Sequence, residues 1–434
     1  MNVPEHLLTR LRPWRDSPAW VVALSGGLDS SALLYALASL SREHQLPPLR
    51  AIHVHHGLQP AADSWPAHCE RLCRSLGVPL HIARVQVAPG GSVEQAAREA
   101  RYAALGRALG AGDVLITGQH RDDQAETLLL RLLRGAGVRG AAAMPVQRPL
   151  GAGLLVRPLL DISREAMLAY ARGVGLDWVE DPSNADARYS RNYLRQQIMG
   201  PLQARWPAAC ANLARSAAHF AEAVTLLDEL ALEDLATAQA GAPLPWLPLP
   251  SLALAPLRGL SEARQRNAIR AWLAPLGRQP DTDHWAGWAA LRDAAPDAAP
   301  IWALADGALY RAGDRAWWLA GPWLHTSPPP PVWALPGQAL DLPGNGQAFW
   351  RGPVPAGTFE VRYREGGERL ALAGRGSRDL KRLLNEAGMP GFVRGRLPLL
   401  FLDGQLVAVA NLPRLRVLEG ELCWRPPTID RCLR

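Results

Sequence analysis

The first half of the chain alternates short apolar runs with longer segments in which apolar residues recur every three or four positions. The apolar runs predict strands and the periodic segments predict helices. Such alternation predicts an α/β fold with a doubly wound parallel sheet and helices on both of its faces. The expected strands are 20–24, 51–55, 80–85 and 114–117, and the expected helices are 29–40, 65–76, 92–109 and 121–134.

The pattern changes in the second half of the chain. It is mainly helical at 191–233 and 265–274, with two short strands expected at 302–304 and 317–319 on either side of a turn at 312–314. After a run of prolines, strands are expected at 358–364, 399–402 and 406–410, and one helix at 378–387. We therefore expect a mainly helical middle domain and a small α+β C-terminal domain. The predicted boundaries are 1–200 for the α/β domain, 201–325 for the middle domain, 326–350 for a proline-rich linker and 351–434 for the C-terminal domain.

Composition narrows the class of protein. No apolar run reaches the roughly 18 residues that span a bilayer, and the N-terminus shows no export signal, so we expect no membrane association. The five cysteines are scattered, which predicts a reducing, cytoplasmic location rather than a disulfide framework. They are Cys69, Cys73, Cys210, Cys423 and Cys432.

Charge is concentrated at one end of the chain. The net charge is +7, and residues 351–434 hold 15 basic and nine acidic side chains. This surplus suggests an anionic partner such as nucleic acid, although a basic surface that only aids solubility would give the same count. Lys381 is the single lysine, since every other basic residue is an arginine.

A glycine turn follows the first predicted strand. It has the sequence Ser-Gly-Gly-Leu-Asp-Ser, and it opens the first predicted helix, where unpaired N–H groups attract phosphate oxygens. Every fixed position matches the pattern of the PP-loop ATP pyrophosphatases. This resemblance implies cleavage of ATP between its α- and β-phosphates, transfer of AMP to an oxygen atom, and Mg²⁺ held by Asp29. The implied ATP-binding residues are Ser25, Gly26, Gly27, Leu28, Asp29 and Ser30.

Further segments, in order along nearly the whole chain, resemble the tRNA(Ile)-lysidine synthases. They are His53–Leu58 with Ala62–Trp65, Glu94–Tyr102, Thr117–Thr127, Asp181–Arg195, Arg364–Gly367 and Arg375–Lys381. The resemblance implies an adenine-nucleotide α-hydrolase-like fold and a ligase that forms carbon–nitrogen bonds. Its substrates would be ATP, free L-lysine and an isoleucine tRNA with a cytidine wobble base. The cytidine would be adenylated and then attacked by lysine at C2, giving lysidine, AMP and pyrophosphate; a homodimer is possible.

Acidic residues gather at the start of the helix predicted at 121–134. Asp122, Asp123 and Glu126 are three or four positions apart and can share a helix face, which suits an ammonium group or Mg²⁺. They could equally be a solvated helix start, where acids favour the dipole. With the turn upstream, we favour lysine binding by His120, Asp122 and Glu126. The lysine amine needs a base, and one of these acids or His120 could accept its proton.

Arg191, Asn192 and Arg195 lie about one helical turn apart. Arginines bind phosphates through paired N–H groups, so this set could stabilise charge during adenylation or hold the tRNA backbone. The alternative is packing and salt bridging with Asp181 or Asp186. The resemblance favours function, and the predicted catalytic residues are therefore Asp29, Asp122, Asp123, Glu126, Arg191 and Arg195.

Other polar residues have two interpretations. His53, His55 and His56 lack the spacing of a zinc set, so we expect a core or nucleotide-contact role. Cys69 and Cys73 are expected to be buried as small hydrophobes.

Near the C-terminus a basic cluster could bind tRNA phosphates or be a solvated face. The predicted tRNA-binding residues are Arg375, Arg378, Lys381, Arg382, Arg394 and Arg396.

Other functions remain possible from sequence. A PP-loop tRNA 2-thiolation enzyme generally needs a Cys-X-X-Cys pair or a catalytic cysteine, whereas this chain has only the wider spacing of Cys69 and Cys73. A non-catalytic RNA-binding scaffold would not need the intact turn at 25–30 or the carboxylates.

Overall fold

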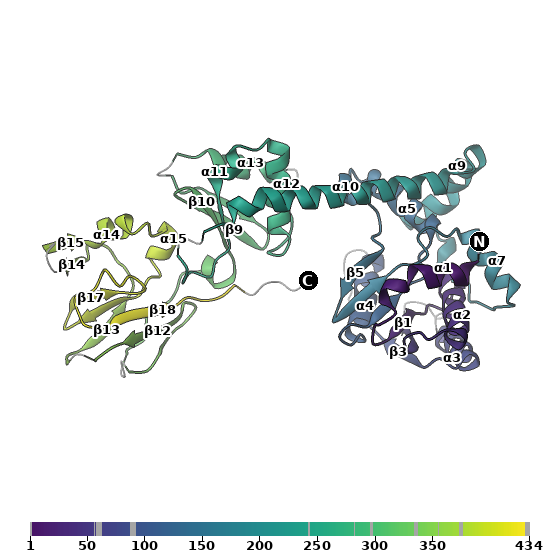
Figure 1. The fold of residues 1–434 in the computed structure, drawn as a ribbon, viewed down its shortest axis with the longest axis horizontal. Coiled ribbons are helices and arrows are strands. Elements are labelled where there is room, and N and C mark those ends of the chain that lie inside the picture. Colours follow the sequence, from purple (N-terminus) through teal and green to yellow (C-terminus); the bar gives the residue numbers. More distant parts are fainter. Residues whose placement is uncertain are drawn as a thin grey trace. The chain divides into compact units, whose positions relative to one another are not determined.

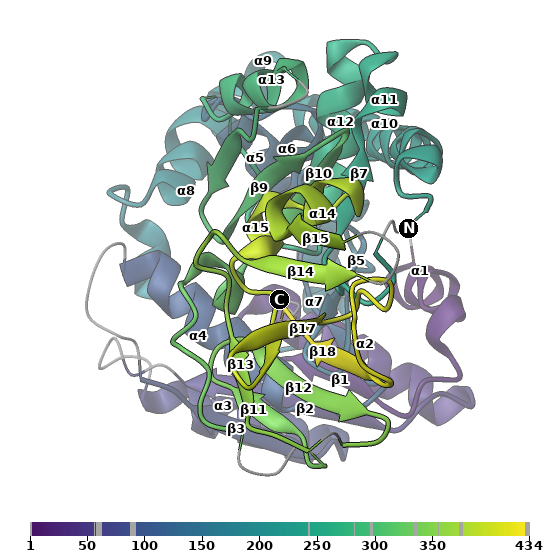
Figure 2. The same ribbon diagram turned by 90° about the vertical axis from the view of Figure 1, so that its left-hand side faces the viewer.

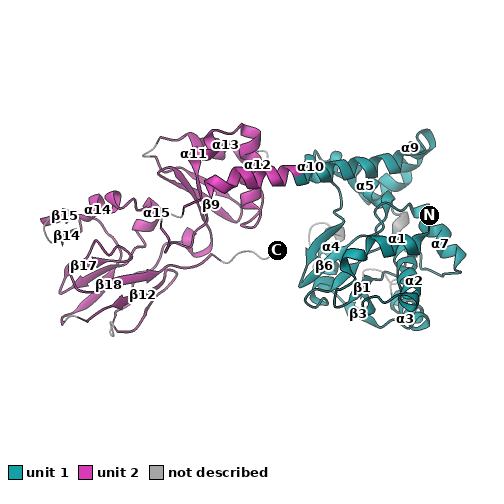
Figure 3. Ribbon diagram, viewed as in Figure 1, with its two compact units in different colours: residues 1–225 teal, residues 226–434 magenta. Residues whose placement is uncertain are grey.

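The structure is a computed structural model that divides the chain into compact units of residues 1–225 and 226–434 (Figure 3). The boundary falls within the long helix α10 (Ala209–Ala238). The predicted domain boundaries are not tested by this division and stay a prediction. The structure describes residues 2–55, 57, 63–86, 93–241, 244–281, 283–295, 298–333, 337–354, 356–372 and 376–429. Of the predicted residues, His56, Leu58, Ala62, Arg375 and Cys432 lie outside this range.

Unit 1 is built on a sheet whose strands, over the described residues, follow the order β3-β2-β1-β4-β6-β5. Strands β3, β2, β1, β4 and β6 each pair in parallel with the next, as predicted. Strand β5 is antiparallel to β6 at the edge of the sheet. The β5–β6 hairpin was not predicted. The strands are β1 (Trp20–Ala23), β2 (Leu49–His55), β3 (Leu80–Arg84), β4 (Val114–Ile116), β5 (Gln147–Leu150) and β6 (Gly153–Val156).

Helices cover both faces of this sheet (Figure 1). The side chains of a strand alternate between faces, so Trp20 and Val22 pack into one hydrophobic cluster and Val21 into another. The first cluster includes residues of α1, α2, α3 and α7, and the second includes Leu105 of α4. The doubly wound α/β fold is thus confirmed. The helices are α1 (Val3–Arg10), α2 (Leu28–Glu43), α3 (Trp65–Leu76), α4 (Val93–Arg107), α5 (Arg121–Leu132), α6 (Val138–Ala141) and α7 (Arg164–Gly173), with the 3₁₀ turn η1 (Arg12–Trp14).

A run of short helical segments follows the sheet and leads into α10. One of them, η4, is a π-helical turn, a wider form that is frequent at functional sites. The segments are η3 (Pro182–Ala185), α8 (Ser190–Tyr193), η4 (Leu194–Met199) and α9 (Gly200–Arg205). The predicted helical region therefore forms, with a break at 206–208 between α9 and α10.

Unit 2 begins with the end of α10, and its first part combines helices with an antiparallel sheet of order β7-β10-β9-β8. The strands expected at 302–304 and 317–319 form as β8 and β10, but the turn at 312–314 joins β10 to β9, a strand that was not predicted. The elements are β7 (Ser251–Ala253), α11 (Leu254–Arg258), α12 (Glu262–Leu273), α13 (Trp285–Asp293), β8 (Ile301–Leu304), β9 (Gly307–Ala312), β10 (Arg315–Leu319) and η5 (Gly321–Leu324).

The last part of unit 2 consists of small antiparallel sheets and short helices, as the α+β prediction requires. Strands β12 and β18 lie side by side in Figure 2, paired from Gln347–Arg425 to Arg351–Glu421. A single hydrophobic cluster joins Trp317 and Trp323 to residues as distant in sequence as Trp424. The elements are β11 (Leu340–Leu342), β12 (Gly346–Arg351), β13 (Phe359–Arg362), β14 (Arg369–Leu372), β15 (Gly376–Asp379), α14 (Leu380–Glu386), α15 (Gly391–Arg394), β16 (Leu399–Leu402), β17 (Gln405–Val409) and β18 (Glu421–Arg425).

Among the described residues, no helix has both the length and the apolar character needed to cross a membrane.

Candidate active site

The turn at 25–30 connects β1 to α2 at the carboxyl end of the sheet. The hydroxyl oxygens of Ser25 and Ser30 lie 2.9 Å apart, and Ser30 Oγ also accepts from the backbone N–H of Ser25 at 3.1 Å. Gly27 is the N-cap of α2, and its side-chain-free position leaves the first N–H groups of the helix without a capping side chain. This arrangement presents backbone donors and hydroxyls to an anion, as a phosphate-binding turn requires.

Glycines allow the turn and its neighbouring loop to pack closely. Gly26 has a φ of +86°, a conformation that side chains rarely adopt, and a Cβ there would lie 3.2 Å from Cys69 Sγ. Gly118 follows β4, and a Cβ on it would lie 2.9 Å from the backbone carbonyl of Asp29. The loop after β4 therefore touches the first turn of α2, which brings the start of α5 to the phosphate-binding turn.

His120 joins the turn to the acidic residues of α5. Its Nε2 atom lies 3.6 Å from Asp29 Oδ2 and 3.5 Å from Asp123 Oδ2, and the side chain is 2% exposed. His120 is also the N-cap of α5, since its backbone N–H donates to Asp123 and its Nδ1 faces the Asp123 N–H. The helix cap thus fixes the imidazole between the two carboxylates.

Asp123 and Glu126 are held by a pair of arginines. Arg191 donates to Asp123 Oδ1 at 2.9 Å and to Glu126 Oε2 at 3.0 Å. Arg195 donates to Glu126 Oε1 at 2.7 Å and to Asp123 Oδ1 at 3.1 Å. The Glu126 side chain is 3% exposed, so this carboxylate–arginine cluster lies inside the protein rather than on a solvated helix start. Asp181 and Asp186, the partners in the alternative interpretation, instead accept from the backbone N–H of Ser183 and from the Arg188 side chain.

Charge pairing sets the protonation of this cluster. Burial alone would raise the pKa of Asp123, but the charges of His120, Arg191 and Arg195 lower it below its ordinary value. Burial would lower the pKa of His120, but the hydrogen bond to Asp29 and the charge of Asp123 raise it. For Arg195, burial is outweighed by the hydrogen bond to Glu126, which raises its pKa. These neighbours therefore favour the charged form of Asp123 and make the His120 imidazole bind a proton more tightly than it does in water.

The other predicted residues of this region have defined places. Asp122 Oδ2 accepts from the backbone N–H of Arg164 at 3.0 Å, at the start of α7. Asn192 donates to the backbone carbonyls of Ser183 at 2.8 Å and Asp186 at 3.0 Å. Asn192 thus fastens the loop at 181–186 to the helix that carries both cluster arginines.

The histidines and cysteines behind the turn are core residues. His53 Nδ1 lies 2.9 Å from the carbonyl oxygen of Leu24 and 3.5 Å from Cys69 Sγ, and His55 lies 3.3 Å from Asp63. Cys69 and Cys73 are buried in the main cluster of unit 1, as predicted. Burial raises the pKa of the Cys69 thiol to about 12 and that of Cys73 to about 11, so neither is a ready thiolate.

The basic residues of the C-terminal region divide into exposed and buried groups. Arg378, Lys381 and Arg382 are exposed along β15 and α14, and Arg382 pairs with Glu386 at 3.2 Å. Arg394 donates to the backbone carbonyl of Met389 at 2.8 Å. Arg396 is 7% exposed and donates to the carbonyls of Gly344, Pro322 and His325 and to Asn345, which argues against a contact with RNA.

Sequence reasoning missed a second polar link at the site. Gln119 Oε1 accepts from Thr117 Oγ1 at 2.5 Å and from Arg157 Nε at 3.1 Å. Arg157 directly follows β6, at the same sheet edge as the turn. The position of Arg157 at the carboxyl end of a parallel strand could have identified it as a site residue. This was missed because β6 was not predicted.

Comparisons with known proteins agree with this geometry. Residues 2–202 match the family model of the PP-loop domain, 252–317 that of the TilS substrate binding domain, and 359–421 that of the TilS substrate C-terminal domain. The chain is 58% identical over 437 residues to the tRNA(Ile)-lysidine synthase of Pseudomonas fluorescens (strain Pf0-1), covering 100% of this chain and 99% of that protein. The chain belongs to the tRNA(Ile)-lysidine synthase family.

A second relative gives the same assignment. The tRNA(Ile)-lysidine synthase of Pseudomonas aeruginosa PAO1 is 60% identical over 430 residues, covering 98% of this chain and 97% of that protein. The family predicted from the motifs of the sequence is therefore confirmed, as is its class, the ligases. The roles of individual site residues are not tested by these likenesses and stay predictions.

Proposed function

We propose that the protein uses ATP to join free L-lysine to C2 of the wobble cytidine of an isoleucine tRNA. Membership of the family supports this function, and one geometric observation carries it. His120 lies within 3.6 Å of Asp29 and 3.5 Å of Asp123, so the phosphate-binding turn and the carboxylate–arginine cluster meet at one imidazole. A nucleotide held by the turn would present its α-phosphate beside groups suited to an amine.

In the first step, the cytidine O2 atom attacks the α-phosphorus of ATP. A bond forms between O2 and phosphorus, the bond from that phosphorus to the bridging oxygen breaks, and pyrophosphate leaves. Ser25, Ser30 and the first N–H groups of α2 would hold the phosphates through hydrogen bonds and the helix dipole. Arg191 and Arg195 would offset the negative charge that develops.

Mg²⁺ fits the first turn of α2. Asp29 Oδ1 is buried and has no hydrogen-bond partner among the residues that the structure describes, which leaves an oxygen ligand for a hard cation. When bound, Mg²⁺ would neutralise charge on the phosphates of ATP. Asp29 would hold the ion, and His120 would fix the other carboxylate oxygen of Asp29.

In the second step, the side-chain amine of lysine attacks C2 of the adenylated cytidine, and AMP leaves with the C2 oxygen. The amine must first lose a proton. His120, Asp122 and Glu126 are the proposed lysine-binding groups, with Asp123 completing the acidic face. Because Arg191 and Arg195 hold both Asp123 and Glu126, these carboxylates would keep their positions when an ammonium group arrives.

The tRNA would also contact the C-terminal region. We propose that Arg378, Lys381 and Arg382 bind its phosphates, because these side chains are exposed on one short strand and helix. Arg394 would support them, whereas Arg396 is engaged in the core. We propose the cytoplasm as the place of the reaction, since ATP, free lysine and tRNA occur there together.

Sulfur transfer to tRNA is less well supported. It would need a reactive cysteine, but burial raises the pKa of each thiol near the turn, to about 12 for Cys69 and about 11 for Cys73.

Incorporation of labelled lysine tests the proposed function. The assay contains purified protein, ATP, Mg²⁺, radiolabelled L-lysine and an isoleucine tRNA transcript with a cytidine wobble base. We expect ATP-dependent incorporation that Asp29→Asn abolishes and Asp16→Asn leaves unchanged. Asp16 is a matched control because it is an exposed aspartate in the same unit.

Other outcomes would contradict the function. Transfer of labelled sulfur to the transcript would favour a thiolation enzyme, and RNA binding without pyrophosphate release would favour a non-catalytic scaffold. Lysine incorporation that persists in Asp29→Asn would show that the turn does not serve the reaction.

A further inference from the structure

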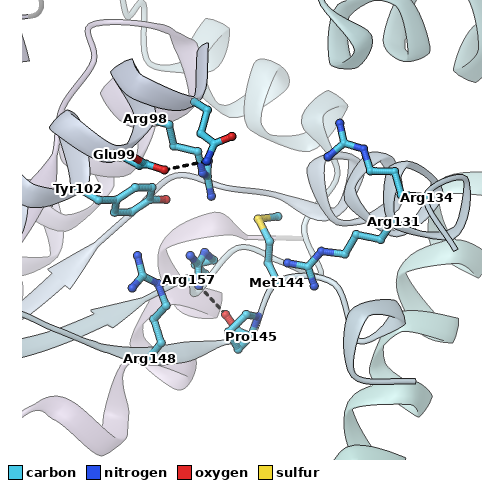
Figure 4. A pocket seen from close by; sticks show the side chains of 10 residues that line it. Arg98, Glu99, Tyr102, Arg131, Arg134, Met144, Pro145, Arg148 and Arg157 are labelled. Carbon is cyan, nitrogen blue, oxygen red and sulfur yellow. Dashed lines mark hydrogen bonds between the residues drawn. The ribbon is translucent and has the colours of Figure 1, made fainter. Parts of the chain in front are cut away.

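A pocket of about 590 Å³ lies beside the active site in unit 1 and has no role in the steps above. It is bounded by α4, by α5 and the residues that follow it, and by the β5–β6 hairpin. Figure 4 shows the guanidinium groups of Arg98, Arg148 and Arg157 on the side of Tyr102, with Arg131 and Arg134 facing them from α5 and its end. Glu99 is the carboxylate among its described lining residues.

The positive charge of this pocket is not neutralised. Within the described part of the chain, no ion pair joins any of its arginines to a carboxylate, and Glu99 instead accepts from Gln95 at 2.8 Å. Arg157 is 3% exposed and donates to the neutral oxygens of Gln119 and Pro145, with the Tyr102 hydroxyl as a further hydrogen-bond partner. Arg131 likewise donates to the carbonyls of Gly140 and Ala143. A buried charge without a counter-ion is costly unless a ligand supplies one.

The ring of Tyr102 orients two of the guanidinium groups in the pocket. The guanidinium carbons of Arg98 and Arg148 lie 4.9 Å and 4.8 Å from the centre of the Tyr102 ring. Burial would raise the pKa of Tyr102, but the surrounding arginines lower it to about 8, which reflects the strength of the positive field. Guanidinium groups stacked on a ring keep their N–H edges in one plane, a geometry that matches two oxygens of a phosphate.

The pocket is joined to the active site by Gln119. This residue accepts from Arg157 and directly precedes His120 in the chain. A phosphate in the pocket would therefore lie near the site at which the cytidine reacts. The arginines at the outer part of the pocket, Arg98 and Arg134, are exposed, so a polymer could enter without unfolding the unit.

We infer that this arginine pocket binds backbone phosphates of the tRNA next to the reacting cytidine. The inference rests on the proposed function for the identity of the RNA, and its chemistry is that of a phosphate anion held by arginine forks. Free pyrophosphate, the product of the first step, is the other source of such an anion. The exposure of Arg98 and Arg134 and the separate position of the pocket from the turn at 25–30 favour the polymer.

Binding measurements on a triple variant test the pocket. Arg98→Gln, Arg134→Gln and Arg148→Gln together remove three charges while leaving the buried Arg157 in place. The matched control is Arg74→Gln, Arg107→Gln and Arg172→Gln, which removes three exposed arginines from other helix ends of unit 1. The probes are a radiolabelled full-length isoleucine tRNA transcript, ATP and inorganic pyrophosphate, each titrated over a range of salt concentrations.

We expect the pocket variant to bind the transcript about tenfold more weakly than the control does, with a salt dependence shallower by about two counterions. Its affinities for ATP and pyrophosphate should equal those of the control. Unchanged RNA affinity and salt dependence relative to the control would overturn the inference. Weaker binding of pyrophosphate with unchanged RNA binding would also overturn it, and would assign the pocket to the product.

The binding assay separates this inference from the proposed function. A protein that loses RNA affinity in the pocket variant but never incorporates lysine would contradict the function and support the pocket. A protein that incorporates lysine normally in both variants would support the function and contradict the pocket. Thermal unfolding of both triple variants, read by circular dichroism, checks that each remains folded.

Discussion

The carboxylate–arginine cluster of unit 1 and the basic segment 376–396 of unit 2 both contain several arginines, but they use them differently. In unit 1, Arg191 and Arg195 face carboxylates that α5 places from its first turn. In unit 2, Lys381 and Arg382 are exposed on α14, whereas Arg396 is buried among backbone carbonyls. The arginines of the first region are held by carboxylate partners. In the second region, some basic side chains are exposed to solvent and Arg396 is buried.

This difference shows that a count of basic residues does not define a binding surface. Arg191 and Arg195 are paired with acids, which leaves only part of their charge for a phosphate, and Arg396 satisfies backbone carbonyl groups. The arginines of the pocket beside Tyr102 are the contrasting case, because among the described residues they have no acidic partners. Variants that remove a paired, a buried or an exposed charged side chain test this comparison between the two regions.

The largest effect is expected for Glu126→Gln. This change leaves Arg191 and Arg195 facing one fewer carboxylate in a partly buried site. We expect the free energy of unfolding to fall by about 2–3 kcal/mol, below the full cost of a deeply buried pair because the two arginines keep some solvent. Urea unfolding measures it. Glu70→Gln, an exposed change on α3, is the control, and equal stability of the two variants would show that the cluster contributes nothing.

The second largest effect is expected for Arg396→Met. The variant keeps an unbranched apolar stem but is shorter, and it leaves several buried carbonyl oxygens without donors, including that of Gly344. We expect a loss of about 2 kcal/mol in the free energy of unfolding, against less than about 0.5 kcal/mol for the exposed Arg382→Met. If Arg396→Met instead weakened tRNA binding at unchanged stability, the residue would belong to the RNA surface after all.

The pH dependence of His120 gives a smaller effect. Its pKa is raised in the folded protein above the ordinary value of 6.5, so the folded state holds the proton more tightly than the unfolded chain does. This contribution is complete below the unfolded pKa and is lost as pH rises through the folded pKa. We therefore expect the stability difference between wild type and His120→Gln to shrink as pH rises above the unfolded pKa and through the folded one.

Urea unfolding at a series of pH values measures this difference. The carboxylates of Asp29, Asp122 and Asp123 face the imidazole, and the pKa of Asp123 is lowered from its ordinary value. A stability difference that grew with pH would mean that the imidazole is neutral in the folded protein.

The smallest effect is expected for Lys381→Ala with Arg382→Ala. Exposed phosphate contacts are individually weak, so tRNA binding should weaken about fivefold, with ATP affinity unchanged. Arg107→Ala with Arg172→Ala removes the same charge from unit 1 and is the control. Loss of ATP binding in the first variant would show that the C-terminal region has been assigned the wrong role.

The sequence predicted the site where local patterns determine the geometry. The turn at 25–30 and the carboxylates of α5 were found because a helix start and the spacing of helical residues place them without long-range information. The family was found in the same way. The hairpin β5–β6 was missed because β5 carries Gln147, Arg148 and Pro149 and the apolar run of β6 is only three residues long, and Arg157 was missed with it.

Pairings between distant segments could not be obtained from one sequence. Arg191 lies 65 residues from Glu126, and only the folded chain shows that it faces this residue rather than Asp181 or Asp186. Burial could not be predicted in unit 2 either, where Arg394 ends α15 and Arg396 follows two residues later, but of these two only Arg396 is buried. Local motifs carry the chemistry, and tertiary structure decides which charges remain free.

Lys381 has a practical consequence for work on the protein. It carries the sole side-chain amine of the chain, and it is exposed in the first turn of α14. A fluorescent amine-reactive dye used above neutral pH should therefore attach to one internal position, apart from the N-terminus. Such a dye would report the arrival of RNA at α14 directly, without engineered cysteines or removal of competing lysines.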